Sequence, residues 1–137
     1  MRYEVITLPI TTAQALAVAP PGPMQLQDSP RSLCAQANFV YGSGGTTVDA
    51  YLQTSLDGGA TWIDIAQFHF TTASARAVFN LSAATPVTTQ YTPTNGTLGA
   101  NTAKDGILGP MFQVKVATTG TYAGNTNLEI DISASER

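Results

Sequence analysis

The feature that most constrains this chain is a two-residue alternation of apolar and polar side chains, repeated in short runs. The clearest runs span residues 33–41, 48–53, 62–70, 77–81, 111–118 and 128–132. A period of two is the repeat of a β-strand, in which successive side chains point to opposite faces. Gly, Pro, Asn and Asp, which favour turns, separate the runs. The sequence therefore predicts an all-β antiparallel sandwich of about eight strands, with a jelly roll as one winding that fits.

The first 32 residues carry weaker patterns. Residues 2–8 alternate, but Pro9 follows them and favours an edge strand or an N-terminal arm. Residues 13–18 could form a strand or a helix, and the Pro-rich residues 20–23 end either one. We therefore expect residues 1–32 to form an arm or edge strand with a Pro-rich loop. Residues 33–137 would form the sandwich body of one domain.

Two irregularities in the pattern lead to further expectations. Ile63 and Ile65 hold one phase of the alternation, whereas Phe68 and Phe70 hold the other, so a β-bulge is expected near Ala66 or Gln67. Residues 87–91 are predicted to form another short strand. Residues 93–110 carry several turn signals, and irregular stretches of this length in compact domains are usually functional or interfacial.

Composition excludes several classes of function. The chain has 137 residues, of which 43% are hydrophobic and 11% charged, with a net charge of −3. Its six Lys and Arg residues are scattered, so no nucleic-acid partner is expected. The sequence contains no apolar run of membrane-spanning length, and residues 1–10 lack the pattern of a signal peptide. The low charge fits a Thr-rich β protein or a surface covered by neighbouring subunits, and both interpretations stay open.

One local motif resembles a known element. Residues 55–62, SLDGGATW, match the Asp-box pattern S-x-D-x-G-x-T-W. In this pattern Asp57 accepts hydrogen bonds from the following backbone, and the glycines reverse the chain. The motif resembles the repeated boxes of sialidase-type β-propellers, which need several copies, whereas this chain has one. We interpret it as a hairpin turn.

The residue types that commonly perform catalysis or bind metals are sparse. His69 stands alone between two phenylalanines in a predicted strand, and we expect a structural or surface role for it. Cys34 is the single cysteine and is expected to pack as a small apolar group. Asp49 and Asp64 lie on predicted strands joined by the Asp57 turn, so they fit either a calcium or paired-carboxylate site or two separate surface acids, and we favour the second interpretation. We therefore expect no enzymatic activity, no catalytic or metal-binding residues and no cofactor.

Four segments between Tyr51 and Ile132 together resemble small proteins encoded in the structural regions of tailed bacteriophages and prophages. They are residues 55–66 (SLDGGATWIDIA), 70–74 (FTTAS), 105–109 (DGILG) and 118–124 (TTGTYAG). The resemblance implies a virion structural protein, assembled in the cytoplasm of a bacterial host. Its expected partners are the major capsid protein or other virion proteins, and further copies of itself in a homo-oligomer.

Within that class, the leading hypothesis is a capsid decoration or cement protein that stabilises the head. A head–tail connector or tail component is the first alternative. A carbohydrate-binding or receptor-binding module is the alternative from another class. It would require exposed aromatic rings gathered on one face, and the candidates are Tyr41, Tyr51, Trp62, Tyr91 and Tyr122.

Overall fold

The alternating runs form strands in the computed structural model, which describes residues 2–90 and 92–135. The strands follow in chain order, with no helix in these ranges. Their bounds are β1 Arg2–Pro9, β2 Gln14–Val18, β3 Met24–Gln25, β4 Ser32–Val40, β5 Ser43–Gly44, β6 Thr47–Ser55, β7 Ile63–Phe70, β8 Ala75–Ser82, β9 Met111–Thr119, β10 Tyr122–Ala123 and β11 Asn127–Ala134. The prediction of an all-β protein is confirmed.

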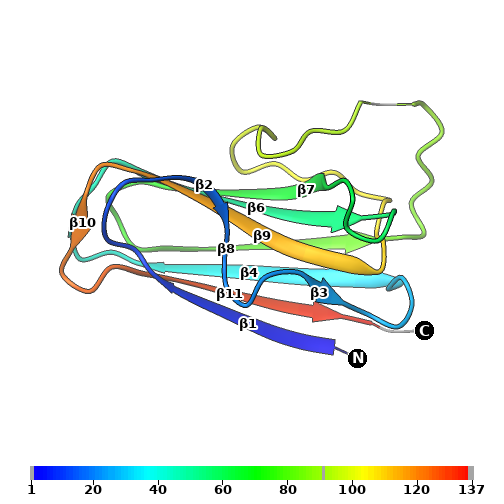
Figure 1. Cartoon of the computed structure of the whole chain (residues 1–137), viewed down its shortest axis with the longest axis horizontal. Helices are drawn as coiled ribbons and strands as arrows, with labels where there is room; N and C mark the ends of the chain where they lie inside the picture. The colour runs from blue at the N-terminus through cyan, green and yellow to red at the C-terminus, as the bar shows by residue number, and fades with distance from the viewer. Residues whose placement is uncertain (1, 91, 136–137) are drawn as a thin grey trace.

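Two antiparallel sheets pack face to face (Figure 1). The first sheet has the order β1-β11-β4-β8. The second has the order β2-β9-β6-β7, and β3 also pairs with β9. A short ribbon of β5 and β10 closes one end of the sandwich.

The connectivity is that of a jelly roll. Eight strands in the described ranges have five or more residues, in agreement with the predicted number. Among these eight, the first pairs with the last, the second with the seventh, the third with the sixth and the fourth with the fifth. The pairs are β1–β11, β2–β9, β4–β8 and β6–β7. One long antiparallel hairpin, wound into two sheets, produces this nested pairing.

The inward faces of the two sheets form the hydrophobic core. In β4 the alternation is strict, since Leu33, Ala35, Ala37 and Phe39 are all at most 1% exposed. The Phe39 ring stacks on Phe70 of the other sheet with centroids 5.0 Å apart. Such aromatic pairs add about 1 kcal/mol to the free energy of burial. This ring pair therefore joins the two sheets across the core.

The expected β-bulge lies at Ile65, one residue before the predicted position. Leu52 pairs with Ala66 and Gln53 pairs with Asp64, so Ile65 has no partner on β6. The bulge reverses the alternation, which turns Asp64 and Gln67 toward the outer face of the second sheet. This local irregularity determines which polar groups face outward at this point.

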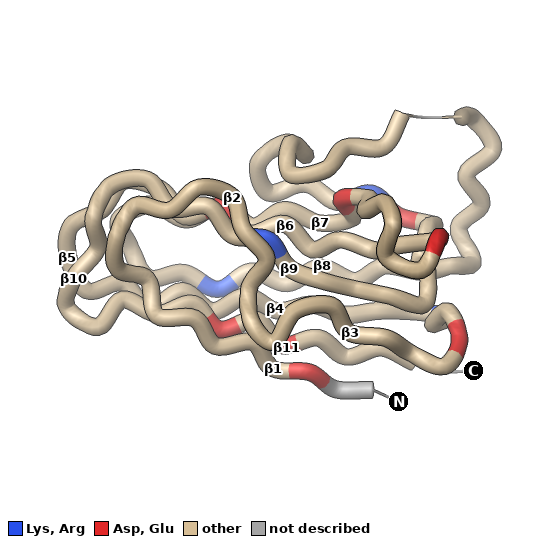
Figure 2. The backbone as a smooth tube through the Cα atoms, viewed as in Figure 1, with Lys and Arg blue, Asp and Glu red and all other residues tan. Residues whose placement is uncertain are grey.

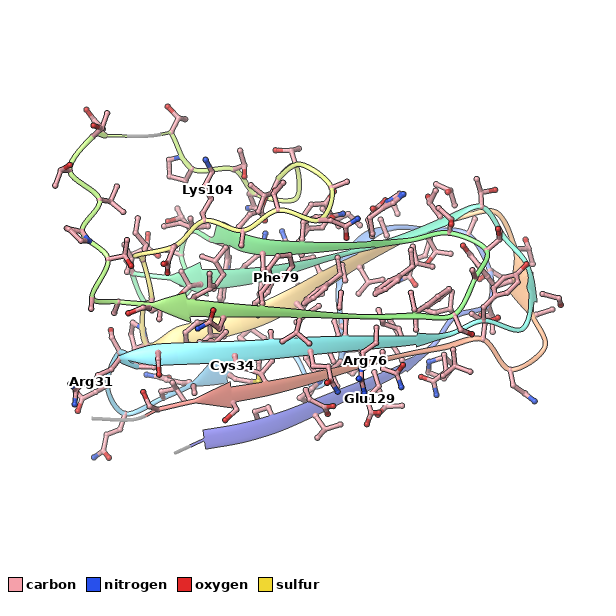
Figure 3. All side chains as sticks on the ribbon, turned by 180° about the vertical axis from the view of Figure 1, so that it is seen from behind. Arg31, Cys34, Arg76, Phe79, Lys104 and Glu129 are labelled. Carbon is pink, nitrogen blue, oxygen red and sulfur yellow. The ribbon has the colours of Figure 1, made fainter. Side chains whose placement is uncertain are left out.

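Two expectations differ from the structure. Residues 87–90 are not a strand, because no neighbouring strand lies beside them, and Tyr91 lies outside the described residues. Cys34 is exposed, because it alternates with the inward Leu33 and Ala35 and so projects from the outer face of the first sheet (Figure 3).

The first 32 residues contribute to both sheets. β1 is an edge strand that pairs with β11 along its whole length. β2 and β3 pair with β9 in the second sheet, and residues 20–23 form the Pro-rich connection between them. In this structure the N-terminal segment is thus part of the sandwich.

Two glycines provide a test of this packing. Gly45 and Gly58 both have left-handed backbones, with φ of 71° and 72°. A Cβ at Gly45 would lie 2.2 Å from the Tyr122 ring, whereas a Cβ at Gly58 would meet nothing within 4 Å. We expect Gly58→Ala to cost about 1 kcal/mol through backbone strain. Gly45→Ala should cost roughly 2 kcal/mol more because the ring must move. Urea unfolding of both variants measures the difference, and equal losses would contradict the packing described.

Candidate functional site

The most distinctive part of the surface is the connection between β8 and β9, residues 83–110. It contains no strand in its described part, yet it projects beyond β7 at one end of the sandwich (Figure 1). We call the part that leads away from β8 the outgoing limb and the part that leads back to β9 the return limb. The return limb follows the free edge of β7, where Gln67 N donates to Thr102 O (2.9 Å) and Lys104 N donates to Ile65 O (2.8 Å). The connection therefore covers an edge that would otherwise expose unpaired backbone groups.

Asp64 is the principal anchor of this connection. Its side chain is 1% exposed and lies beneath the turn formed by residues 94–98. Its carboxylate accepts hydrogen bonds from the backbone N–H groups of Gly96 (2.8 Å), Thr97 (3.0 Å) and Leu98 (3.2 Å). Thr94 Oγ1 donates a further bond of 2.9 Å. Successive N–H groups directed at one anion form a nest, and this one is filled by the protein's own carboxylate.

Buried amide side chains surround Asp64 on the same outer face. Gln53 Nε2 donates to Asp64 Oδ1 (2.8 Å) and to Asn95 Oδ1 (2.7 Å). Gln113 Nε2 donates to Gln53 Oε1 (2.8 Å). Gln53 and Gln113 are at most 2% exposed, although they project away from the hydrophobic core. Asp64, Gln53 and Gln113 together form a buried polar layer. Because each of these polar groups has a hydrogen-bond partner, the layer holds the connection on the sheet at little desolvation cost.

A second aspartate, Asp105 of the return limb, binds the outgoing limb at the end of β8. Asp105 Oδ1 accepts from Ser82 N at the end of β8 (2.6 Å), and Asp105 Oδ2 accepts from Thr85 Oγ1 (3.0 Å). These hydrogen bonds, with the Ser82 backbone first, lower the pKa of Asp105. Both limbs of the connection are thus held by a carboxylate.

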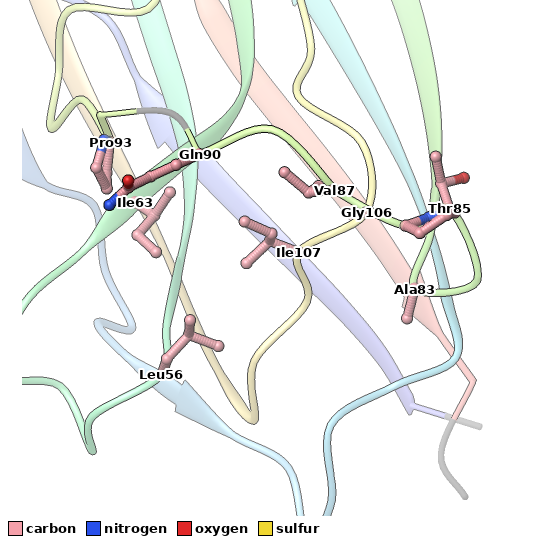
Figure 4. A pocket seen from close by; sticks show the side chains of 10 residues that line it. Leu56, Ile63, Ala83, Thr85, Val87, Gln90, Pro93, Gly106 and Ile107 are labelled. Atoms are coloured by element: carbon pink, nitrogen blue, oxygen red, sulfur yellow. The ribbon is translucent and has the colours of Figure 1, made fainter.

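An apolar groove lies between the two limbs (Figure 4). Its volume is about 490 Å³, within the range of ligand and peptide sites. Its lining carries no charged side chain and consists of Leu56, Ile63, Ala83, Thr85, Pro86, Val87, Gln90, Pro93, Gly106 and Ile107. Leu56 is 60% exposed and Val87 is 43% exposed. This groove is suited to contact with apolar groups of a partner.

The acids weighed in the sequence do not form one site. Asp64 is enclosed as described, whereas Asp49 contacts His69 Nδ1 and accepts a hydrogen bond from Gln67 Nε2 (2.8 Å). Asp57 lies at the β6–β7 turn. Within residues 2–90 and 92–135, no three His, Cys, Asp or Glu side chains group as metal ligands do.

The Asp-box segment forms the predicted hairpin turn between β6 and β7. Asp57 Oδ1 accepts from Thr61 N (2.8 Å), and Gly59 N donates to Ser55 Oγ (2.9 Å). The Thr61 side chain, the Thr61 backbone and Ser55 lower the pKa of Asp57 to about 2. Gly58 and Gly59 have positive φ, as this reversal requires.

The aromatic side chains do not gather on one face. Tyr122 is 2% exposed and lies near the β5–β10 ribbon, where Tyr41 packs edge-on against it. Tyr51 lies on the outer face of the second sheet, and Trp62 lies at the opposite end beside Gly59. Tyr91 is outside the described residues. A platform of several rings for a glycan chain is therefore not formed by the described aromatics.

The Lys and Arg positions are scattered along the described backbone and do not follow one another on any strand (Figure 2). No helix long and apolar enough to cross a membrane occurs within the described ranges. The principal feature of the site, the buried polar layer around Asp64, was not predicted from the sequence. The only signals for it were the length of the 93–110 stretch and its turn residues.

Comparison with known proteins identifies no family. No family model and no curated protein matches the sequence. Among solved structures, one chain described as "CBM4 structure and function" is similar at a TM-score of 0.42 and 9% identity, covering 98% of this chain and 71% of that chain. A chain of infectious bursal disease virus, Gx strain, is similar at a TM-score of 0.31 and 12% identity, covering 98% of this chain and 40% of that chain.

The role of Asp64 can be tested by hydrogen exchange. We expect the amide protons of Gly96, Thr97 and Leu98 to exchange slowly, because a buried carboxylate accepts them. Asp64→Ala should destroy this protection and lower the free energy of unfolding by about 3 kcal/mol or more. Asp28→Ala, at an exposed surface acid, is the control. Rapid exchange of all three amides in the wild-type protein would contradict the anchor.

The Asp57 turn predicts a pH dependence of stability. The native pKa of about 2 lies below the ordinary value of 3.8, so the ionised form is stabilised by folding. This contribution is complete above the ordinary pKa and is lost as the pH falls through 3.8 toward 2. We expect Asp57→Asn to melt at a lower temperature than the wild type at pH 7, with the gap narrowing near pH 2. A gap that is constant with pH would exclude this origin.

Proposed function

We propose that this chain is a non-enzymatic structural protein of a tailed-bacteriophage virion, of the capsid decoration type. It would bind the outer surface of the capsid lattice in many copies and stabilise the head. The observation that carries the proposal is the anchored connection with its uncharged apolar groove. Carboxylates hold both limbs of the connection, and the groove between them is lined without any charged side chain.

The surface chemistry supports docking to protein. An exposed apolar groove whose lining carries no charged side chain is typical of an interaction site. An anchored connection loses little conformational freedom on binding, which favours affinity from a modest contact area. Repetition of the contact around a symmetric lattice would multiply its strength through avidity. The resemblance of residues 55–66 and the three other segments to phage structural proteins supports the virion as the location.

Topology does not decide between the candidate functions. Jelly rolls serve in viral capsids, in lectins and in cupins, so the winding is compatible with several of them. A head–tail connector would share the fold and could use the same groove. Copy number separates the two roles, since a lattice offers hundreds of sites and a neck offers about a dozen.

The proposal is tested by counting copies in purified particles. Quantitative mass spectrometry would compare peptides of this chain with peptides of the major capsid protein. We expect a ratio near one, or a simple fraction of one, per capsid subunit. A handful of copies per particle would instead assign the chain to the neck or tail, and absence from the particles would reject the virion role.

Two exposed residues of equal accessibility test the groove itself. Leu56, in the groove, is 60% exposed, and Val78, on the outer face of the first sheet, is 62% exposed. We expect Leu56→Asp to reduce binding to particles that lack the protein by at least about tenfold, because docking would bury the introduced charge. Val78→Asp should bind as the wild type does. The opposite pattern would move the docking surface to the first sheet.

A further inference from the structure

A polar cluster on the outer face of the second sheet is not used by the proposed docking. The register places Asp49 beside His69 and Tyr51 beside Gln67 on neighbouring strands. Asp49 and Tyr51 are two residues apart on β6, so both side chains project from the same face, about 7 Å apart along the strand. On the other side, Ala117 stands next to Asp49 and Lys115 next to Tyr51. The cluster therefore covers an area close to that of one sugar ring.

Hydrogen bonds hold this cluster in place before any ligand binds. Asn101 N donates to Gln67 Oε1 (2.7 Å), and Gln67 Nε2 donates to Asp49 Oδ1 (2.8 Å). Asn101 Oδ1 in turn accepts from His69 N (3.0 Å). Asn101 has a φ of 56°, a left-handed conformation that is uncommon outside glycine. Asn101, in the return limb of the connection, thus holds the Gln67 side chain and the His69 backbone in place.

Two polar atoms of the cluster remain available for a ligand. Asp49 Oδ1 receives Gln67 and contacts His69 Nδ1, whereas Asp49 Oδ2 has no hydrogen-bond partner in the described chain. Because Nδ1 faces the carboxylate, the other ring nitrogen, Nε2, is left to hydrogen-bond a ligand. The side chains of His69 and Asp49 are 31% and 26% exposed, so a ligand can reach both.

We propose that Asp49, His69 and Tyr51 form a binding site for a neutral sugar or similar polyol. One hydroxyl group would donate to Asp49 Oδ2 and the adjacent one would hydrogen-bond His69 Nε2, while a carbon face of the sugar packs on the Tyr51 ring. The Asp49 carboxylate disfavours an anionic ligand. Lys115 beside Tyr51 disfavours a cation, and one carboxylate with one imidazole is too few ligands for a typical metal site.

The site is distinct from the many-ringed platform excluded above, because it needs one ring and one sugar unit. It also does not rest on the virion proposal, since isolated protein suffices to test it. The pKa of the Tyr51 hydroxyl is raised, first by burial and then by the negative charge of Asp49, which agrees with their proximity.

The experiment is a titration of the full chain followed by amide NMR spectra. The probes are glucose, galactose, mannose and N-acetylglucosamine, each to about 100 mM, with Zn²⁺ as a separate probe. We expect at least one sugar to shift the amides of Asp49, Tyr51, His69 and Asn101 with a millimolar Kd. Asp49→Ala and Tyr51→Thr should weaken binding at least about tenfold, whereas the surface control Asp28→Ala should not.

Three results would overturn the proposal. They are shifts confined to another surface, no shift with any sugar, and binding by Zn²⁺ but by no sugar. Undiminished sugar binding by both Asp49→Ala and Tyr51→Thr would also reject it. The dispersion of the variant spectra shows whether each variant is folded, and the wild-type titration remains decisive if one is not.

Discussion

The interaction on which the rest of the surface depends is the burial of the Asp64 carboxylate under the 94–98 turn. A buried charge is costly unless hydrogen bonds compensate for it, and here three successive N–H groups and two side chains do so. Since those partners all come from the long connection or from β6, the turn cannot leave without exposing an unpaired carboxylate. The same bonds therefore position the groove on one side and Asn101, with the polar cluster, on the other.

Much of the fold could be predicted because the information is local. Strand alternation appears within each run, and even the bulge at Ile65 is visible as a change of phase between Ile65 and Phe68. The Asp57 turn is specified by eight consecutive residues, 55–62. Each of these features depends on neighbours in sequence, so a pattern of residue types is enough to locate it.

The candidate site could not be predicted in the same way. Asp64 and its backbone partners are about thirty residues apart, and an outward polar residue looks the same in sequence whether water or a loop covers it. The residue type of Cys34 favours packing as a small apolar group, whereas its position between the inward Leu33 and Ala35 puts it on the outer face of the sheet. Residues 87–90 do not form the expected strand, because β-branched residues make a strand only where they pair with a neighbouring strand, and none lies beside them.

The jelly roll is a rigid support for the anchored connection, whose groove we propose as the surface that docks on the virion shell. The most direct measurement is a cryo-EM reconstruction of purified particles at a resolution that separates strands. We expect sandwich-shaped density on the outer capsid lattice, oriented with the apolar groove of the β8–β9 connection against the shell. Density at the neck or tail, or contact through the first sheet with the groove facing solvent, would contradict it.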